Sequence, residues 1–280
     1  LHSFPTRRSS DLSDSAFHSL RSGAMRGLDA DSAGSNPWIQ LGLIEHPSAD
    51  PQFWAVIQTI RCIRECGEPD QVVPRLVALT TGNTSLPENG ITATLLTRLQ
   101  SLGWHVAQDG LIADMFGLFA LFQVSLQEIV MRAIWAWQLV VAQKVSHRPG
   151  FFNLQFADAV DTRCWLKQLP CDDQILFQKC LNGCHITQDG KSHCQEGGSE
   201  QCPYCQCSDS RYHRFWQCER FAHRRAHLPH DLQVLLPSLP EFLTGYGWSL
   251  RPHTMLQWYR MLAEIPCSPL VVLEPLHHDI

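Results

Sequence analysis

The chain has 280 residues, 44% of them hydrophobic and 18% charged, which is enough apolar material to bury a core divided between two units. The formal net charge of −5 argues against a protein that coats polyanions through its overall field, so a nucleic-acid contact has to come from a local basic surface. The longest apolar-looking stretch, Met115 to Gln127, is too short and too polar to span a bilayer, and we expect no membrane segment.

The cysteines indicate the redox compartment. The chain contains 12 Cys, and many of them crowd between Cys171 and Cys207 without a secretory signal ahead of them. This usage is typical of a reducing environment, so we predict an intracellular location, in the cytoplasm or the nucleus.

The two ends of the chain predict a fragment. Residues 2–12 resemble the translation of a sequencing-adapter oligonucleotide, so residues 1–12 are expected to carry no biological function. Residues 1–35 as a whole are predicted to be a disordered lead-in, because the part after the adapter is rich in Ser, Gly, Ala and Asp. The chain stops at Ile280 without a helix-ending signal, which suggests a reading frame cut before a further domain.

Residues 36–170 are predicted to form a helical region. Asp50 before Pro51 is an N-cap signal, and apolar residues follow at helical spacing until Gly67. A second helix is expected from Ile91 to Leu102, where Leu residues recur at helical intervals.

The next segments predict one short strand and one long helix. A small strand and turn are expected between Trp104 and Gly110. From Ile112 to about Val145 the apolar pattern predicts a strongly helical, largely buried segment. The expected core is therefore a set of packed helices.

The last third of the chain should hold short helices and a metal-binding insertion. Two helices are predicted at residues 161–169 and 173–181, and a final pair at 237–243 and 252–262. The fold class is thus mostly α. A small zinc-binding module is expected over residues 171–230, and residues 231–280 should be a helical tail or linker towards a missing downstream domain.

A single structural zinc site is predicted at Cys202, Cys205, His213 and Cys218. Their spacing is C-x2-C-x7-H-x4-C, in which the paired cysteines can turn both sulfurs onto one ion while the imidazole and third thiol complete a tetrahedron. His213 and Cys218 are five residues apart and cannot both face the ion from the middle of a regular α-helix, so a helix should begin near His213 or be distorted there.

Other residues of the same types near the predicted zinc site are possible alternative ligands. Cys207 is an alternative to Cys205, and His223 and His227 are alternatives to His213. A second conceivable group lies upstream, but it lacks a two-residue gap between cysteines, so free thiols are favoured there. Its members are Cys180, Cys184, His185, His193 and Cys194.

A local basic surface surrounds the predicted zinc site. Between residues 202 and 227 the Arg residues outnumber the acids, and aromatic rings lie between them. Guanidinium groups pair with phosphates and rings stack on bases, so these Arg are candidate nucleic-acid contacts. They are Arg211, Arg214, Arg220, Arg224 and Arg225. Of the aromatic residues, Phe215 and Trp216 are expected to form a small core against the zinc.

The segment from Cys202 to Cys218 resembles the zinc-binding domain that follows the polymerase in reverse transcriptases of LINE-type, non-LTR retrotransposons. The resemblance rests on the ligand spacing and on the context Asp-Ser-x-x-His-Arg-Phe-Trp-x-Cys at residues 209–218. The stretches 177–183 and 187–189 are similar to the approach to that domain. The likeness extends over about residues 160–228.

The resemblance implies a role within a polyprotein. RNA template or target DNA would be the partner, residues 50–145 would correspond to the thumb and connecting helices, and a ribonuclease H domain would follow. Polymerase and nuclease centres would then lie outside this chain. Phe156-Ala-Asp158-Ala159 resembles the metal-binding turn of reverse transcriptases, but Ala159 replaces the second acid, so Asp158 is predicted to be a helix-terminal or surface residue.

These observations favour a non-catalytic, zinc-stabilised fragment of a retrotransposon reverse transcriptase that contributes to RNA or DNA binding. No nucleophile elbow, phosphate loop or paired-carboxylate motif is recognisable in the sequence, so we expect no enzyme activity. The alternative is a host-encoded, zinc-stabilised adaptor whose Trp-rich helices bind a protein partner.

Overall fold

The computed structural model describes residues 14–28, 36–82, 90–148, 150–184 and 200–251. Over these ranges the chain is mostly helical with one small sheet, which confirms the predicted mostly α class. In chain order the main elements are α1 (Asp14–Leu28), α2 (Pro37–Ile39), the π-helical turn η2 (Gln40–Ile44), α3 (Pro51–Cys66), α4 (Pro69–Thr80), α5 (Ile91–Ser101), β1 (His105–Val106), β2 (Ile112–Asp114), β3 (Gly117–Phe119), α6 (Leu126–Val145), α7 (Ala159–Gln168), α8 (Cys171–Leu181), the π-helical turn η5 (His213–Gln217), α10 (Ala222–Arg225), α11 (His230–Leu235) and α12 (Glu241–Thr244).

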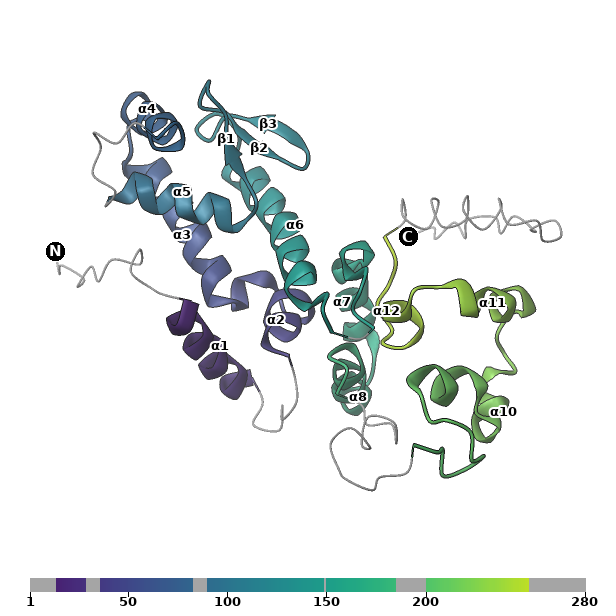
Figure 1. The fold of residues 1–280 in the computed structure, drawn as a ribbon. Coiled ribbons are helices and arrows are strands. Elements are labelled where there is room, and N and C mark those ends of the chain that lie inside the picture. The colour runs from purple at the N-terminus through teal and green to yellow at the C-terminus, as the bar shows by residue number, and fades with distance from the viewer. Residues whose placement is uncertain (1–13, 29–35, 83–89, 149, 185–199, 252–280) are drawn as a thin grey trace.

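Helix α6 is the central element of the arrangement. Figure 1 shows it running from the small sheet to the middle of the molecule, where α7, α8 and α12 gather, with α10 and α11 on the side away from α3, α4 and α5. Trp137 of α6 is fully buried, and its ring lies 6.0 Å from that of Trp38 and 5.8 Å from that of Phe53. Turn η2 packs close to α6, because a β-carbon at Gly42 would lie 2.6 Å from Val141 Cγ2.

The prediction of one helix from residue 112 to 145 is wrong in its first third. Residues 112–119 instead form a hairpin that continues β1 into an antiparallel sheet of order β1-β2-β3, and the helix starts after the N-cap Ser125. The local cause is a turn, because Asp114 accepts a hydrogen bond from the Phe116 N–H at 2.7 Å and Gly117 has a φ of 118°. The strand predicted between residues 104 and 110 is confirmed as β1.

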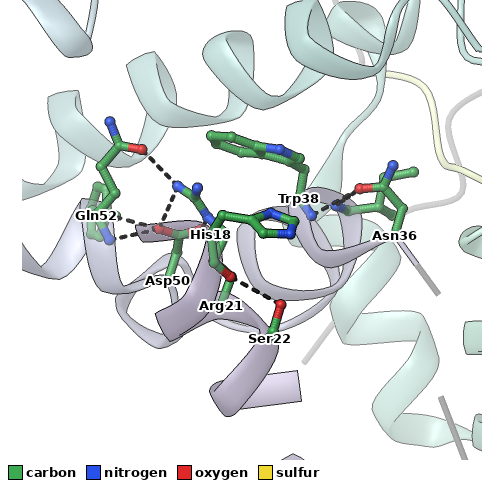
Figure 2. A network of polar contacts seen from close by, with 9 residues as sticks. His18, Arg21, Ser22, Asn36, Trp38, Asp50 and Gln52 are labelled. Atoms are coloured by element: carbon green, nitrogen blue, oxygen red, sulfur yellow. Dashed lines mark hydrogen bonds and ion pairs between the residues drawn. The ribbon is translucent and has the colours of Figure 1, made fainter. Parts of the chain in front are cut away.

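The prediction of a disordered lead-in is also wrong for residues 14–28, which form the packed helix α1. Its Arg21 donates two hydrogen bonds to Asp50, at 2.7 and 3.1 Å, and both side chains are buried. The Arg21 guanidinium also lies 3.6 Å from the centre of the Trp38 ring (Figure 2). Although the segment is rich in small and polar residues, Phe17, Arg21 and Met25 follow one another at four-residue intervals. They therefore lie on one face of the helix, and all three are buried. The remainder of the predicted lead-in lies outside the described residues.

The predicted N-cap of α3 is confirmed and has a second task. Asp50 Oδ1 accepts hydrogen bonds from the backbone N–H of Gln52 at 2.8 Å and of Phe53 at 3.3 Å. The same carboxylate receives Arg21, whose guanidinium also donates to the Gln52 side chain at 2.7 Å (Figure 2). One buried acid therefore starts α3 and holds α1 against it.

Residues 242–251 form a strap that ties the later part of the chain to the core. Phe242, Tyr246 and Trp248 are buried, and Trp248 Nε1 donates to the Leu181 carbonyl at 3.1 Å. The Asp158 N–H donates to the Ser249 carbonyl at 2.7 Å, at the start of α7. The buried hydrophobic cluster thus continues from the early helices through α8 to the strap, across the boundary that we expect at residue 170.

The short helices expected around Pro170 are confirmed as α7 and α8. Where a helix is predicted at residues 237–243, the chain makes a 3-10 turn, Leu236–Ser238, and the four-residue helix α12. The helix predicted at 252–262 lies outside the described residues. None of the helices in the described ranges is both long and apolar enough to cross a bilayer.

Candidate metal centre

The four predicted ligands converge on one point. The Sγ atoms of Cys202, Cys205 and Cys218 and a ring nitrogen of His213 all lie within 4.8 Å of one another. The Cys202 and Cys218 sulfurs are 3.8 Å apart, and Cys205 Sγ lies 3.1 Å from His213 Nε2. Cys202, Cys218 and His213 are buried, and Cys205 is half-buried. These four side chains are therefore placed to hold one metal ion.

A tight hairpin presents the first two cysteines. The Cys202 N–H donates to the Cys207 carbonyl at 2.7 Å, and the Gln206 N–H donates to the Cys202 carbonyl at 3.0 Å. Gln206 adopts a left-handed conformation, with a φ of 63°, which closes the turn. An antiparallel bridge between Gln201 and Ser208 extends the hairpin by one pair. We call residues 201–218 the knuckle.

The other two ligands come from the π-helical turn η5. The Cys218 N–H donates to the His213 carbonyl at 2.7 Å, five residues back, so the turn is wider than an α-helical turn. Widening brings residues five apart towards the same side of the helix. The predicted distortion near His213 is thus confirmed, and it is what lets both side chains face the cysteine hairpin.

Hydrogen bonds within the site favour the ionised form of the Cys202 thiol. Burial alone would raise the pKa of the Cys202 thiol, but hydrogen bonds from the Tyr204 N–H and the His213 ring outweigh it and lower the pKa to about 7. At Cys205 the Cys207 N–H favours the thiolate, but burial and bonds shared with neighbouring thiols raise the pKa to about 12. Metal ions bind cysteine as the thiolate and histidine as the neutral imidazole, so metal binding at this site should release protons.

The competing ligands do not enter the site. Cys207 is exposed, and its thiol points back to the Cys205 carbonyl at 3.7 Å. His223 is exposed on α10, and His227 is exposed beyond it. Of the second conceivable group, only Cys180 and Cys184 belong to the described residues. Burial raises the pKa of the Cys180 thiol, which disfavours its ionised form.

Three of the five candidate Arg side chains are occupied within the protein. Arg214 forms an ion pair with Asp209, which is fully buried next to the ligands, and this pairing raises the pKa of the guanidinium. Arg225 donates to the Cys218 carbonyl at 2.7 Å and to the Phe215 carbonyl at 3.2 Å. Arg211 donates to the Tyr246 hydroxyl in the strap and stacks on its ring at 4.7 Å.

The remaining two candidates face solvent. Arg220 and Arg224 are exposed, and within the described part of the chain neither forms an ion pair. The sequence could not distinguish these two from the other three, because the partners of the occupied Arg residues are Asp209, carbonyls of the π-helical turn η5 and its C-cap, and Tyr246 of the strap. Asp209 is the one partner that lies within five positions of its Arg.

The aromatic residues near the four candidate ligands differ in burial and in their partners, which the sequence did not indicate. Trp216 is half-buried and donates from Nε1 to the Thr244 carbonyl of α12 at 2.6 Å. Phe215 is 38% exposed rather than part of a core. Tyr204, which the motif treats as a spacer, is 57% exposed beside the ligands. Asp158 is confirmed as a helix-terminal residue, because it caps the start of α7.

Comparisons with known proteins give no family for the chain. No protein-family model, no curated protein and no solved structure matches it. The candidate metal centre therefore rests on its own geometry.

Proposed function

We propose that the chain is a non-catalytic, intracellular part of a retrotransposon reverse transcriptase polyprotein, in which one structural zinc ion orders a surface for RNA or DNA. The observation that carries the proposal is the convergence of three thiols and one imidazole within 4.8 Å. The resemblance of the knuckle to the zinc-binding domain of LINE-type reverse transcriptases supports the polyprotein setting.

The chemistry of the ligand set favours zinc. Thiolate and imidazole ligands suit zinc, whereas magnesium and calcium prefer oxygen. Zn–S bonds of about 2.3 Å in a tetrahedron place two sulfurs roughly 3.8 Å apart, and Cys202 and Cys218 have this separation, 3.8 Å. Four protein ligands leave no position for an activated water, so the ion would stabilise structure rather than perform hydrolysis.

The surface for nucleic acid is smaller than the five Arg residues of the sequence suggest. Arg211, Arg214 and Arg225 hold the knuckle in place, and Arg220 and Arg224 are the two of the five that can meet phosphates without giving up an ion pair within the described residues. Contacts of this kind fix position without reading sequence, so we expect little base preference.

A protein-binding adaptor is the second candidate function. Large apolar side chains are exposed on helices outside the knuckle, among them Trp54 at 48%, Trp165 at 58% and Leu176 at 61%. A protein partner that covered them would remove this apolar area from water. The adaptor reading needs no contact with nucleic acid, and salt dependence separates the two candidates.

The test is binding of short RNA and DNA strands to the purified chain over a range of salt concentrations. Arg220→Gln combined with Arg224→Gln should flatten the slope of log affinity against log salt by about 1.4 to 1.8, the contribution of two phosphate contacts. The matched control is Arg26→Gln with Arg75→Gln, two exposed Arg residues on α1 and α4, which should leave the slope unchanged. If the Arg220 and Arg224 variant binds as well as the parent at every salt concentration, the adaptor becomes the better reading.

A second arm tests the role of the metal. Cys205→Ser should lose bound zinc, measured by elemental analysis, and should weaken binding although the thiol touches no nucleic acid, because the knuckle has too few apolar residues to fold without its ion. Metal-dependent nucleotide incorporation or strand cleavage by the purified parent would contradict the non-catalytic part of the proposal.

A further inference from the structure

An exposed aromatic side chain lies beside the candidate metal centre. Tyr204 follows Cys202 by two positions in the hairpin turn, and 57% of its surface is exposed. Its ring meets that of Phe221 edge-on, with centroids 5.8 Å apart and planes at 79°. An edge-to-face contact covers at most one face of the Tyr204 ring, and more than half of the side chain is open to solvent. A flat ligand group can therefore stack on the ring.

A guanidinium is placed next to this ring. The Arg220 Cζ atom lies 6.0 Å from the centre of the Tyr204 ring, and Arg220 is one of the two exposed Arg residues near the knuckle without an ion pair in the described ranges. A cation beside an exposed aromatic face is the pairing by which proteins hold a phosphate next to a stacked base.

A groove passes these two side chains. It has a volume of about 1210 Å³ that includes the side of the candidate metal centre, because its lining contains Cys205 and His213 as well as Tyr204, Gln217 and Arg220. Clefts that hold drug-sized ligands have volumes of about 300 to 1,000 Å³, so the groove has room for one nucleotide of an extended chain. Glu219 also lines the groove, and its charge opposes a phosphate.

We infer that Tyr204 and Arg220 form a binding subsite for one nucleotide of a single strand, with the base stacked on the Tyr204 ring and its phosphate paired with Arg220. The inference rests on the proposed nucleic-acid function and adds the residues that contact the strand. Stacking needs an unpaired base, so a single strand is the expected ligand and a blunt duplex is not. Glu219 should weaken the same contact through like-charge repulsion.

The experiment uses the full chain, a labelled oligouridine and a blunt RNA duplex, with zinc content measured for every variant. Tyr204→Ala should weaken binding of the single strand by about 5- to 150-fold, the range for one lost stacked base, whereas Tyr204→Phe keeps the ring and should bind like the parent. Glu219→Gln should tighten binding and Arg220→Gln should weaken it. Phe152→Ala is the matched control, because this ring is 72% exposed outside the knuckle.

The outcomes separate the subsite from the proposed function. If the parent binds neither RNA, the proposed function fails and the subsite falls with it. If the parent binds with salt dependence but Tyr204→Ala and Phe152→Ala behave alike, only the subsite is overturned. Should Tyr204→Ala lose its zinc, photo-crosslinking of the parent to 4-thiouridine RNA decides the matter, because crosslinks should map to residues 201–221 and their absence there overturns the inference.

Discussion

At the scale of single residues, Tyr246 is a closely packed side chain of the strap. Its ring is buried against Phe151, with centroids 4.3 Å apart. A β-carbon at Gly150 would come within 2.2 Å of the Tyr246 ring, and one at Gly183 within 2.9 Å, and both glycines have positive φ. Two glycines in the left-handed region therefore leave the space that the ring fills.

The burial of Tyr246 predicts a loss of stability at high pH. Burial raises the pKa of its hydroxyl to about 12, against an ordinary value of 10, and Arg211 only partly offsets this. Because the folded state resists ionisation, stability is full below pH 10 and is lost as the pH rises towards 12, by about 2 to 3 kcal/mol in all. Urea unfolding followed by Trp fluorescence measures this loss.

Tyr246→Phe provides the comparison. The variant should be less stable than the parent at pH 7, by roughly 1.5 to 3 kcal/mol, because the Arg211 guanidinium loses its acceptor. Between pH 10 and 12 its stability should fall less steeply than that of the parent. Equal slopes in the two proteins would mean that another group causes the alkaline loss.

At the scale of elements, the small sheet depends on the close packing of its turn. Gly110, between β1 and β2, has a φ of +81°, and a β-carbon there would lie 2.2 Å from Val73 Cγ1 on α4. Gly103, before β1, has a similar φ of +74° but open space around its α-carbon. At both positions the positive φ would strain a residue that has a β-carbon. Only at Gly110 would that β-carbon also clash with a neighbouring side chain.

Gly110→Ala should therefore destabilise the protein more than Gly103→Ala does. Both variants carry the cost of a left-handed alanine, and only the first forces a methyl group into a packed contact, which costs about 1 to 3 kcal/mol more. Thermal or urea unfolding of both gives the difference. Adding Val73→Ala should recover part of the loss at Gly110 and none at Gly103. Equal losses at the two glycines would show that α4 moves aside.

At the scale of the whole molecule, two contacts connect the candidate metal centre to the core. Trp216, inside η5, donates to the Thr244 carbonyl of α12 at 2.6 Å. Arg211, two residues before a ligand, contacts Tyr246 in the strap. The strap in turn reaches α8 through Trp248 and the Leu181 carbonyl. A disordered knuckle would remove both anchors from the strap.

Chelation of the metal should consequently loosen more than the knuckle. Hydrogen exchange measured by mass spectrometry should rise sharply over residues 201–218 and also rise over residues 242–248, while α3 and α6 stay protected by their own packing. Trp216→Phe is the uncoupling variant. The variant should keep the metal. Its strap should exchange hydrogen faster than that of the parent before chelation, and chelation should increase this exchange less. An unchanged strap in the chelated parent would contradict this coupling.

Some of these features follow from local sequence. The spacing of Cys202, Cys205, His213 and Cys218 predicted that these four side chains converge, because tetrahedral coordination restricts which spacings can meet. The cap at Asp50 and the helices on either side of Pro170 were likewise predictable, since capping and proline act over one helical turn.

Tertiary structure decided the rest. Residues 112–119 carry a pattern that suits a helix, but the turn at Asp114 and Gly117 and the pairing of β2 with both β1 and β3 make them strands. The segment from residue 14 to 28 folds because Asp50, far along the chain, accepts Arg21. Among the five Arg residues near the knuckle, Arg211 and Arg225 are occupied by partners that the fold supplies. Features that depend on neighbours within one helical turn, or on coordination chemistry, could be predicted from the sequence. Long-range contacts determine which charged and aromatic side chains remain exposed for a partner.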